Sequence, residues 1–501
     1  MQFNQYQVAF FDALRSGRSN IVLNAVAGSG KTTTLVEAYR VIGDTSSMVF
    51  LAFNKHIAAE LGHRMPGVDC RTIHSLGFDA CCRASRSKKP SVSDRKKYVV
   101  FDSIMEDNWH LCGTRMRDVL GKREPKDFRY DVVRLYDLVR STLTDPSDGD
   151  AIGLVAAHFG IEDYDGLAIE CAGECIVRSD DLWKDGGLLD FTDMLWLPYR
   201  FGYSTRTYKT VLVDELQDLS ASQLHIAMSA LGYQGRFIGV GDPHQAIQGF
   251  AGADANAFYN AMNTTGAIEL PLSVCYRCPS KHVSLASEFV PQIEASPDAE
   301  PGEILGIGND EFWNVYAPES GDLVISRTNA PLVQHALKLI SQGVHARIRG
   351  NDISEGLTNI IKRVGLYMRK GEQFVSEFDL ALEAAQDDAL LRLVGKPDSE
   401  GQVQRVKDQF ECARVLFESS GAKSLDDLRG EVADLFSDVS GAIWLSSIHR
   451  AKGLEAENVY ILNPDKMEIN YPTQREWQAQ QERNVHYVGL TRSKSVMYMV
   501  K

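Results

Sequence analysis

The chain has 501 residues, a formal net charge of −14 at pH 7 and 44% hydrophobic residues. This composition is typical of globular proteins and excludes a disordered or fibrous chain. At roughly 100–200 residues per domain, the length predicts about three or four domains. The acidic balance argues against a protein that coats nucleic acid through bulk positive charge.

The N-terminal segment up to Gly17 lacks the basic stretch and following apolar stretch of a signal peptide. No apolar run approaches the roughly 18 residues that a membrane helix needs. Nine cysteines at irregular spacing indicate reduced thiols in a cytosolic protein. We therefore expect no membrane partner and a cytoplasmic location.

Eight short aliphatic runs predict buried parallel strands, because helix-compatible segments separate them. In chain order they are 21–23, 48–53, 211–213, 237–240, 323–325, 443–445, 459–462 and 496–500. They fall into two groups, and a polar segment with helical periodicity interrupts each group. The pattern predicts an α/β fold with two parallel-sheet domains, each carrying a mostly helical insertion.

These changes in texture also predict the domain boundaries. The expected parts are the first domain (1–80 and 188–270), its insertion (81–187), the second domain (271–355 and 441–501) and its reduced insertion (356–440). A basic run from Arg83 to Lys97 opens the first insertion. It is either a solvated face or a surface that grips duplex phosphates.

The first predicted strand runs into Asn24–Thr32, a glycine-rich turn followed by a helix-compatible segment. Strand, turn and helix are the context of a phosphate-binding loop, although Ala25 stands where the strict pattern has glycine. Backbone N–H groups and the helix N-terminus attract phosphate, Lys31 reaches the β- and γ-phosphates, and Thr32 ligates Mg²⁺. The candidate nucleotide-binding residues of this loop are Ala27, Gly28, Ser29, Gly30, Lys31, Thr32 and Thr33.

An acidic motif supports this interpretation. The apolar run 211–213 is followed directly by Asp214 and Glu215. A carboxylate at the strand tip, Asp214, can hold Mg²⁺, and Glu215 can polarise the attacking water. The metal candidates are thus Thr32 and Asp214. The two motifs predict Mg²⁺-dependent NTP hydrolysis, but they do not say what the hydrolysis drives.

Further motifs indicate what it drives. In order, they are Asp214–Asp218, Gly241–Ile247, Cys275–Arg277, Ser447–Glu455 and Tyr487–Arg492. This series resembles the superfamily-one DNA helicases of the UvrD/Rep/PcrA type. The segments Leu51–Lys55 and Thr72–Phe78 look closest to the F-box DNA helicase branch. The resemblance extends from Phe3 to about Val500, apart from the two insertions, and implies two RecA-like P-loop NTPase domains.

The resemblance implies that the nucleotide is ATP. It implies that Gln7 makes the base-specific hydrogen bonds to the adenine, that Tyr276 stacks on the adenine ring and that Glu455 contacts the ribose. These three residues therefore join the loop residues as candidate ATP ligands.

The resemblance also implies charge around the γ-phosphate. Arg277 and Arg492 would reach it from the second domain, and Gln245 would sense it from the first. Arginine fingers are worth roughly 10³–10⁵ in rate in GTPases, because catalysis there is largely electrostatic. The candidate catalytic residues are Lys31, Asp214, Glu215, Gln245, Arg277 and Arg492.

The resemblance places candidate DNA contacts in both domains. They are Phe53, Asn54, Thr72, His74, Phe250 and His449. Aromatic faces stack on bases of any sequence, which suits a motor that walks along single-stranded DNA. The structural alternative for Phe53 and Phe250 is a core aromatic. Gln248 and Ala251 stand where the family usually has an aromatic and an arginine, so stacking here depends on Phe250.

We therefore expect an ATP-dependent DNA helicase or translocase in replication, repair or recombination, moving 3′ to 5′ as the resemblance implies. The alternative is a DNA-stimulated ATPase that strips proteins from DNA or regulates other factors without processive unwinding. A helicase–nuclease needs a further domain, and only nine residues follow Arg492. We expect a monomer that acts on single-stranded DNA and single-strand–duplex junctions, beside replication or repair proteins, in a bacterial or phage-infected cell.

Two residue pairs have a second interpretation. Cys275 and Cys278 have the C-x-x-C spacing of a zinc or iron–sulfur site, but no second such pair exists, which favours buried thiols. Asp190 and Asp193 lie in a segment that leads back into the first domain. We interpret their carboxylates as structural rather than catalytic.

Overall fold

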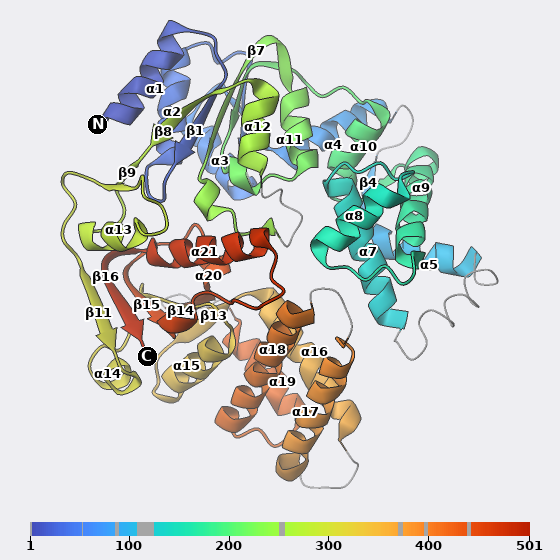
Figure 1. The fold of residues 1–501 in the computed structure, drawn as a ribbon, viewed down its shortest axis with the longest axis vertical. Helices are drawn as coiled ribbons and strands as arrows, with labels where there is room; N and C mark the ends of the chain where they lie inside the picture. Colours follow the sequence, from blue (N-terminus) through green and yellow to red (C-terminus); the bar gives the residue numbers. More distant parts are fainter. Residues whose placement is uncertain are drawn as a thin grey trace. The chain divides into compact units, whose positions relative to one another are not determined.

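The computed structural model describes residues 3–52, 54–85, 90–107, 125–249, 256–368, 374–394, 399–437 and 442–501. The chain forms two compact units (Figure 1). The first comprises Met1–Ala25 and Gly30–Ser273, and the second comprises Val26–Ser29 and Val274–Lys501. Each unit is built around a six-stranded sheet of its own.

The sheet of the first unit has parallel strands in the order β3-β2-β6-β7-β1-β8. The strands are β1 (Ile21–Ala25), β2 (Met48–Ala52), β3 (Asp69–Thr72), β6 (Tyr208–Val213), β7 (Leu231–Gly241) and β8 (Ile268–Leu272). Ile21 and Leu23 of β1 belong to one core and Val22 to another, on the opposite face. Because side chains alternate between faces, a strand that is buried on both sides must be continuously apolar.

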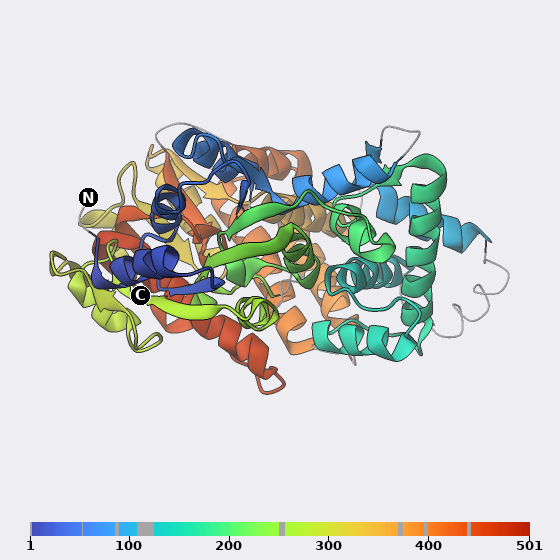
Figure 2. The same ribbon diagram turned by 90° about the horizontal axis from the view of Figure 1, so that it is seen from above.

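Helices cover both faces of this sheet (Figures 1 and 2). One face packs against α1 (Gln5–Ser16), α2 (Lys31–Ile42) and α3 (Lys55–Arg64). The other face packs against α4 (Ile73–Ala84), α10 (Asp193–Phe201), α11 (Ala221–Ser229) and α12 (Ala257–Thr265). This is the arrangement expected when helical crossovers join parallel strands.

The segment between α4 and α10 has a separate core. Its helices are α5 (Lys96–Asp107), α7 (Pro125–Ser141), α8 (Gly149–Phe159) and α9 (Leu167–Gly186). Val132, Tyr136 and Ile176 are fully buried in this core, which also includes Trp196 of α10. A short parallel pair, β4 (Ser91–Val92) with β5 (Leu188–Leu189), joins the two ends of the segment.

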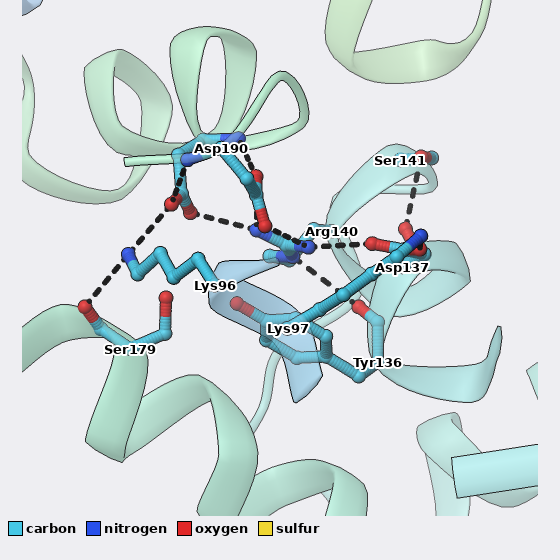
Figure 3. Close-up of polar contacts among 9 residues, drawn as sticks. Lys96, Lys97, Tyr136, Asp137, Arg140, Ser141, Ser179 and Asp190 are labelled. Carbon is cyan, nitrogen blue, oxygen red and sulfur yellow. Dashed lines mark hydrogen bonds and ion pairs between the residues drawn. The ribbon is translucent and has the colours of Figure 1, made fainter. Parts of the chain in front are cut away.

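Buried charges fasten this segment to the start of α10 (Figure 3). Lys96 Nζ lies 2.6 Å from Asp193 Oδ2, and the fully buried Arg140 lies 2.9 Å from Asp190 and 2.7 Å from Asp193. Each aspartate also accepts a hydrogen bond from the backbone N–H of the other. Breaking a buried ion pair costs about 3–5 kcal/mol, because it leaves a charge without a partner. These contacts support the structural interpretation of the two carboxylates.

The sheet of the second unit is also parallel, in the order β11-β16-β15-β12-β14-β13. Its strands are β11 (Glu303–Ile307), β12 (Leu323–Ser326), β13 (Ala346–Arg349), β14 (Ile443–Ser447), β15 (Ala456–Leu462) and β16 (Ser493–Val500). A two-stranded parallel pair precedes it, β9 (Val274–Cys275) with β10 (Glu294–Ala295). One helix follows each of five strands of this unit. After β9, β11, β12, β14 and β15 these are α13 (Ser280–Ala286), α14 (Asn309–Asn314), α15 (Ala330–Ser341), α20 (Ile448–Ala451) and α21 (Glu476–Leu490).

Four helices interrupt this unit between β13 and β14. They are α16 (Asn351–Tyr367), α17 (Phe374–Leu391), α18 (Ser399–Ser420) and α19 (Leu425–Leu435). Their buried side chains share one continuous core with the sheet, in which Ile361 and Phe378 join Val324 of β12. Asp408 of α18 also accepts the backbone N–H of Asn329 at 3.0 Å, at the start of α15. This insertion is therefore fused with its sheet.

The predicted α/β class with two parallel sheets is confirmed. All eight predicted runs lie in the inner strands of the two sheets, although residue 53, at the end of the second run, lies outside the described residues. Within the two six-stranded sheets, the four strands without a predicted counterpart are β3, β8, β11 and β13, which are the edge strands. The predicted four-part domain boundaries stay a prediction. Among the described helices, none is long and apolar enough to cross a membrane.

Candidate nucleotide and DNA site

The candidate residues of the first unit gather at the carboxyl edge of its sheet. The phosphate-binding loop follows β1, Asp242 follows β7 and Asp214 follows β6, and these three strands are neighbours. The predicted DNA residues Asn54 and Thr72 lie at the ends of the next two strands, β2 and β3. Ligands of open parallel sheets bind at this edge, where helix N-termini point toward the ligand.

The phosphate-binding loop has the backbone that phosphate binding needs. Gly30, at φ 77°, directly precedes α2, and Gly28 has φ 67°. Lys31 starts α2, and its Nζ lies 3.4 Å from the carbonyl of Ala25 and 3.9 Å from Asp242 Oδ2. The hydroxyl of Ser29 is buried without a hydrogen-bond partner among the described residues. A buried polar group without a partner and a nearby ammonium fit a bound phosphate group.

The candidate metal ligands lie together. Thr32 Oγ1 donates a hydrogen bond to Asp214 Oδ2 at 2.8 Å. Burial and the neighbouring Glu215 raise the pKa of Asp214 to about 6, against the opposing effects of Thr32 and Lys31. A carboxylate whose charge is disfavoured in this way gains from a nearby cation. The hydroxyl and carboxylate oxygens are also the hard donors that Mg²⁺ prefers, so the residues fit the ion.

A chain of hydrogen bonds connects the remaining catalytic candidates of the first unit. Gln217 Nε2 donates to Glu215 Oε2 at 2.6 Å, and Gln217 Oε1 accepts the backbone N–H of Asp242 at 2.9 Å. Asp242 Oδ2 in turn accepts a hydrogen bond from Gln245 Nε2 at 2.7 Å. The sequence predicted Glu215 and Gln245 as site residues, but it gave no role to Gln217 or Asp242, although both stand inside the recognised motifs.

Gln7 is already engaged within the first unit. Its side-chain Oε1 accepts the backbone N–H of Asn4, and its Nε2 donates to Thr34 Oγ1 at 3.0 Å. The side-chain Oδ1 of Asn4 accepts the backbone N–H of Gln7 at 2.9 Å, which completes a capping box at the start of α1. The predicted adenine contact of Gln7 would therefore exchange with these bonds, and it stays a prediction.

In the second unit the nucleotide candidates lie at the opposite, amino edge of the sheet. Glu455 directly precedes β15 and Arg492 directly precedes β16. The two strands are neighbours, and the N–H of Ala456 donates to the carbonyl of Arg492 at 3.2 Å. The sequence-distant residues Glu455 and Arg492 are thus brought together by the pairing of their strands.

Arg277 pairs with Glu455 in the second unit. Its Nε lies 2.6 Å from Glu455 Oε2, and its Nη1 donates to the carbonyl of Thr491 at 3.3 Å. Lys494 Nζ lies 2.7 Å from the other carboxylate oxygen of Glu455. Burial alone would raise the pKa of Glu455, but Lys494 and Arg277 outweigh it, so the pKa is lowered. Glu455 is therefore ionised at neutral pH and holds two cations.

Arg492 is 1% exposed and is bound by its own unit. Its Nε donates to the carbonyl of Val488 at 2.7 Å, and its Nη1 to the carbonyl of Leu454 at 3.3 Å. Its Nη2 donates to Thr491 Oγ1 at 2.8 Å. Val488 lies in the last turn of α21, where the free carbonyls and the helix dipole favour a cation.

The loop Val26–Ser29 packs with residues of the second unit. The N–H of Ala27 donates to the hydroxyl of the fully buried Tyr487 at 2.9 Å, and the N–H of Tyr276 donates to the carbonyl of Gly28 at 2.9 Å. A Cβ on Gly28 would lie 2.9 Å from Cys275 Sγ, so this approach requires glycine. Tyr276 itself is 48% exposed, which leaves ring surface for the predicted stacking.

Cys275 and Cys278 behave as a thiol pair. Both are buried, and the N–H of Cys278 donates to Cys275 Sγ at 3.4 Å. The hydrogen bond from the Cys278 thiol leads the interactions that lower the pKa of Cys275 to about 6. The part of the chain that the structure describes contains no group of three or more metal-ligating side chains. Cys275 and Cys278 are thus buried free thiols in contact with each other.

Three predicted DNA residues of the first unit lie at or near the starts of two helices. Asn54 caps α3 through a bond from the N–H of Ile57 at 2.9 Å, and Thr72 caps α4 through a bond from the N–H of Ser75 at 3.2 Å. His74 lies in the first turn of α4, and burial lowers its pKa, so its ring is neutral at neutral pH. Phe53 and Phe250 lie outside the described residues.

An exposed ring that the sequence did not single out lies beside His74. Phe191 is 48% exposed, and its ring meets that of His74 edge-on with centroids 6.1 Å apart. It stands between the two aspartates of the buried charge cluster, so the backbone around it is fixed. An aromatic residue between two carboxylates is the sequence signal that marks it.

His449 is the predicted DNA residue of the second unit. It lies in α20, after β14, at the carboxyl edge of the sheet. Burial lowers its pKa to about 3, with help from the charges of Arg327 and Arg405. The His449 ring is therefore neutral at neutral pH, and its contact with DNA stays a prediction.

Fold and site together define a P-loop NTPase with two RecA-like parallel sheets. The chain belongs to the UvrD-like helicase family. Residues 7–265 match the model of the UvrD/REP helicase N-terminal domain, and residues 402–501 match that of the UvrD-like helicase C-terminal domain. The resemblance predicted from the motifs is thus confirmed.

Three relatives show the breadth of this similarity. F-box DNA helicase protein 1 of Schizosaccharomyces pombe is 22% identical, across 94% of this chain and 54% of that protein. ATP-dependent DNA helicase UvrD2 of Mycobacterium tuberculosis is 24% identical, across 96% of this chain and 76% of its own length. DNA helicase II of Escherichia coli is 26% identical, across 56% and 39%. The chain thus spans about half the length of the fission yeast relative.

Proposed function

We propose that this protein is an ATP-dependent DNA helicase that translocates along single-stranded DNA and unwinds duplexes. The observation that carries the proposal is the carboxyl edge of the first sheet. Phosphate, metal and water candidates follow β1, β7 and β6, and the DNA candidates follow the adjoining β2 and β3. Adjacent sites on one rigid edge allow a change at the phosphate to alter the grip on DNA.

The residues divide the chemistry among them. Lys31 and the loop N–H groups bind the phosphates, Thr32 and Asp214 hold Mg²⁺, and Glu215 orients and deprotonates the attacking water. Mg²⁺, when bound, neutralises phosphate charge. Gln245 senses the γ-phosphate through its tie to Asp242. Each contribution acts through position and charge, which is how phosphoryl transfer is catalysed.

We further propose that Arg277 and Arg492 reach the γ-phosphate during turnover. Both guanidinium groups would first have to leave the acceptors that hold them in the second unit. Such an exchange gives a ready coupling between nucleotide state and conformation, since the arginines have two alternative sets of partners. Tyr276 and Glu455 would complete the nucleotide contacts with the adenine and the ribose.

DNA-stimulated ATP hydrolysis is the first test of this proposal. Single-stranded DNA should raise the rate of phosphate release at least about 10-fold over the DNA-free rate, and removal of Mg²⁺ with a chelator should abolish it. A blunt duplex should stimulate much less, because its bases are not available for stacking. No stimulation by any DNA would contradict the proposal.

The alternative function is a DNA-stimulated ATPase that strips proteins from DNA or regulates other factors. It predicts the same hydrolysis but no strand separation. Release of streptavidin from biotinylated single-stranded DNA, measured beside unwinding, separates the two functions. The proposal includes movement from 3′ to 5′ along single-stranded DNA. It also includes action as a monomer at single-strand–duplex junctions, beside replication or repair proteins. The proposed location is the cytoplasm of a bacterial or phage-infected cell.

A further inference from the structure

Gln217 occupies a central position in the first unit, between the ends of β6 and β7. It lies in the 3₁₀ turn Leu216–Asp218 and is 2% exposed. Its Nε2 donates to Glu215 Oε2 at 2.6 Å and to Asp218 Oδ2 at 3.2 Å. Its Oε1 accepts the N–H of Asp242 at 2.9 Å. One carboxamide thus joins the candidate base to the segment that carries the γ-phosphate sensor.

The fold makes specific room for this carboxamide. A Cβ on Gly241, at the end of β7, would lie 2.6 Å from Gln217 Oε1 and 3.2 Å from the Gln217 backbone nitrogen. The close approach of Gln217 to β7 therefore depends on a residue without a side chain. The position of Gln217 is thus set from two strands rather than from its own turn alone.

The chemistry also requires an uncharged donor at this place. Glu215 has a left-handed backbone, at φ 51°, which is uncommon for a residue other than glycine and fixes where its side chain begins. The hydrogen bond from Nε2 then fixes where the carboxylate ends. A cation here would neutralise a base, and a third carboxylate would repel Glu215 and Asp218. A carboxamide orients the base and leaves its charge intact.

We propose that Gln217 is a positioning residue for ATP hydrolysis, which orients the Glu215 carboxylate and holds it in register with Gln245 through the backbone of Asp242. This inference rests on the proposed ATPase function. It adds that the base and the sensor move together, because a single side chain is bonded to the segments of both.

Two variants test the inference, Gln217→Glu and Gln217→Leu. The first is nearly isosteric and replaces a donor by an acceptor that faces two carboxylates, and the second removes both hydrogen-bonding atoms. In both we expect the kcat of DNA-stimulated ATP hydrolysis to fall about 10- to 100-fold, within the range of general-base effects. The KM for ATP should stay within about 3-fold, because Gln217 touches the base and not the phosphate ligands.

The split between kcat and KM provides a measurement that a purely structural role would not change. Loss of the donor leaves the Glu215 carboxylate without its orienting bond, so kcat should fall in both variants while the KM for ATP and the affinity for single-stranded DNA stay near wild type. Wild-type kcat in both variants would overturn the inference. A loss confined to KM would overturn it as well.

Gln223→Leu is the matched control. Gln223 is a glutamine at the start of α11, where its Oε1 accepts the N–H of Ser220 at 2.8 Å in a capping box. This variant should lower the melting temperature and leave kcat within about 2-fold. An equal loss of kcat in Gln223→Leu would show a packing effect and overturn the inference. A wild-type protein without DNA-stimulated hydrolysis would instead overturn the proposed function, a distinguishable result.

Discussion

The two units present their candidate nucleotide residues on opposite edges of similar sheets. In the first unit Lys31 and Asp214 lie at the carboxyl edge, beside helix N-termini that attract phosphate. In the second unit Glu455 and Arg492 lie at the amino edge, beside the last turn of α21. A helix C-terminus attracts cations, so this edge favours arginine side chains rather than phosphate.

The two halves also differ in how far they are organised. In the first unit the candidates bond to one another, as in the pair of Thr32 with Asp214. In the second unit Arg277 bonds to Glu455, the predicted ribose ligand, and Arg492 bonds to backbone carbonyls and a hydroxyl, so both guanidinium groups are occupied. In the proposed function, the first half binds phosphate directly, and Arg277 and Arg492 would exchange partners before they contribute. Such an exchange would give the nucleotide a means to change the conformation of the protein.

Lys31→Ala tests the organised half and should have the largest effect. We expect ATP hydrolysis to fall at least about 10³-fold, because the ammonium that contacts the β- and γ-phosphates is lost. Affinity for a labelled single-stranded oligonucleotide, measured by fluorescence anisotropy, should stay within about 3-fold. Lys209→Ala is the control, since Lys209 is paired only at the surface with Asp44 and is 74% exposed. Retained turnover in Lys31→Ala would refute the placement of the phosphate site.

Arg492→Lys tests the second unit, where the arginine is held by local acceptors, and should have the next largest effect. A lysine keeps the charge but cannot make the three separate bonds of the guanidinium group. We expect kcat to fall about 100-fold with little change in the KM for ATP. Pre-steady-state phosphate release separates the two constants. A rise in the KM for ATP without a fall in kcat would mean that Arg492 contributes to nucleotide binding rather than to stabilisation of the transition state.

Glu455→Gln tests the predicted ribose contact and should have a smaller effect. Loss of the carboxylate frees Arg277 and Lys494 but also removes the predicted ribose contact. We expect the KM for ATP to rise about 10-fold, while a 2′,3′-dideoxy nucleotide, which lacks the ribose hydroxyls, should show almost no difference between variant and wild type. Equal losses with both nucleotides would argue against the ribose contact. Lys494→Met is the control, because it removes a cation beside Glu455 but keeps the carboxylate, and it should change the KM for ATP less than about 2-fold.

Asp214→Asn should also abolish turnover because a proposed Mg²⁺ ligand is lost, but its effect on thermal stability should be the smallest free-energy change of the series. The folded protein holds the pKa of Asp214 at about 6, above its usual 3.8, so folding favours the protonated acid. The contribution of protonated Asp214 to folding stability is fully present below pH 3.8 and is lost as the pH rises through 6. Without Mg²⁺ at pH 8, we expect Asp214→Asn to melt about 2–4 °C higher than wild type.

The pH dependence makes this prediction specific to the buried carboxyl. The difference in melting temperature should shrink at pH 5, where wild-type Asp214 is protonated, and Asp465→Asn at an exposed position should show no difference at either pH. A less stable Asp214→Asn at pH 8 would contradict the unfavourable charge of Asp214 and the cation site inferred from it.

The inner strands were predictable from the sequence and the edge strands were not, for a physical reason. An inner strand such as β1 is buried on both faces and reads as a continuous apolar run. Edge strands are partly exposed, as in β3, whose sequence Asp69–Thr72 is polar. Nothing in the composition of such a segment distinguishes a half-covered strand from a loop.

The site was predictable where a motif fixed local geometry, and less so where strands from distant segments meet. Asp214 directly follows β6 and Lys31 follows the loop after β1, so their placement at one edge of the sheet could be anticipated. The hydrogen bond between Gln217 and Asp242 depends on the pairing of β6 with β7, which cannot be deduced from the sequence. The engagement of Arg492 by the carbonyls of α21 likewise requires the three-dimensional fold.

The net charge of −14 is compatible with a DNA partner, because net charge describes the whole surface and not one track. A motor that releases DNA in every cycle needs a local groove with aromatic rings and a few cations. We expect its DNA affinity to be modest and to fall steeply between 50 and 200 mM salt, the range in which counterion release weakens phosphate contacts. Affinity that does not change with salt would contradict phosphate contacts.

Strand displacement on tailed duplexes tests the central claim most directly. The substrates are one short duplex with a single-stranded 3′ tail and the same duplex with a 5′ tail, each with ATP and Mg²⁺, and Lys31→Ala serves as the inactive control. The account predicts unwinding of the 3′-tailed substrate by the wild-type protein and none by the variant. DNA-stimulated ATP hydrolysis without displacement of either substrate would contradict it.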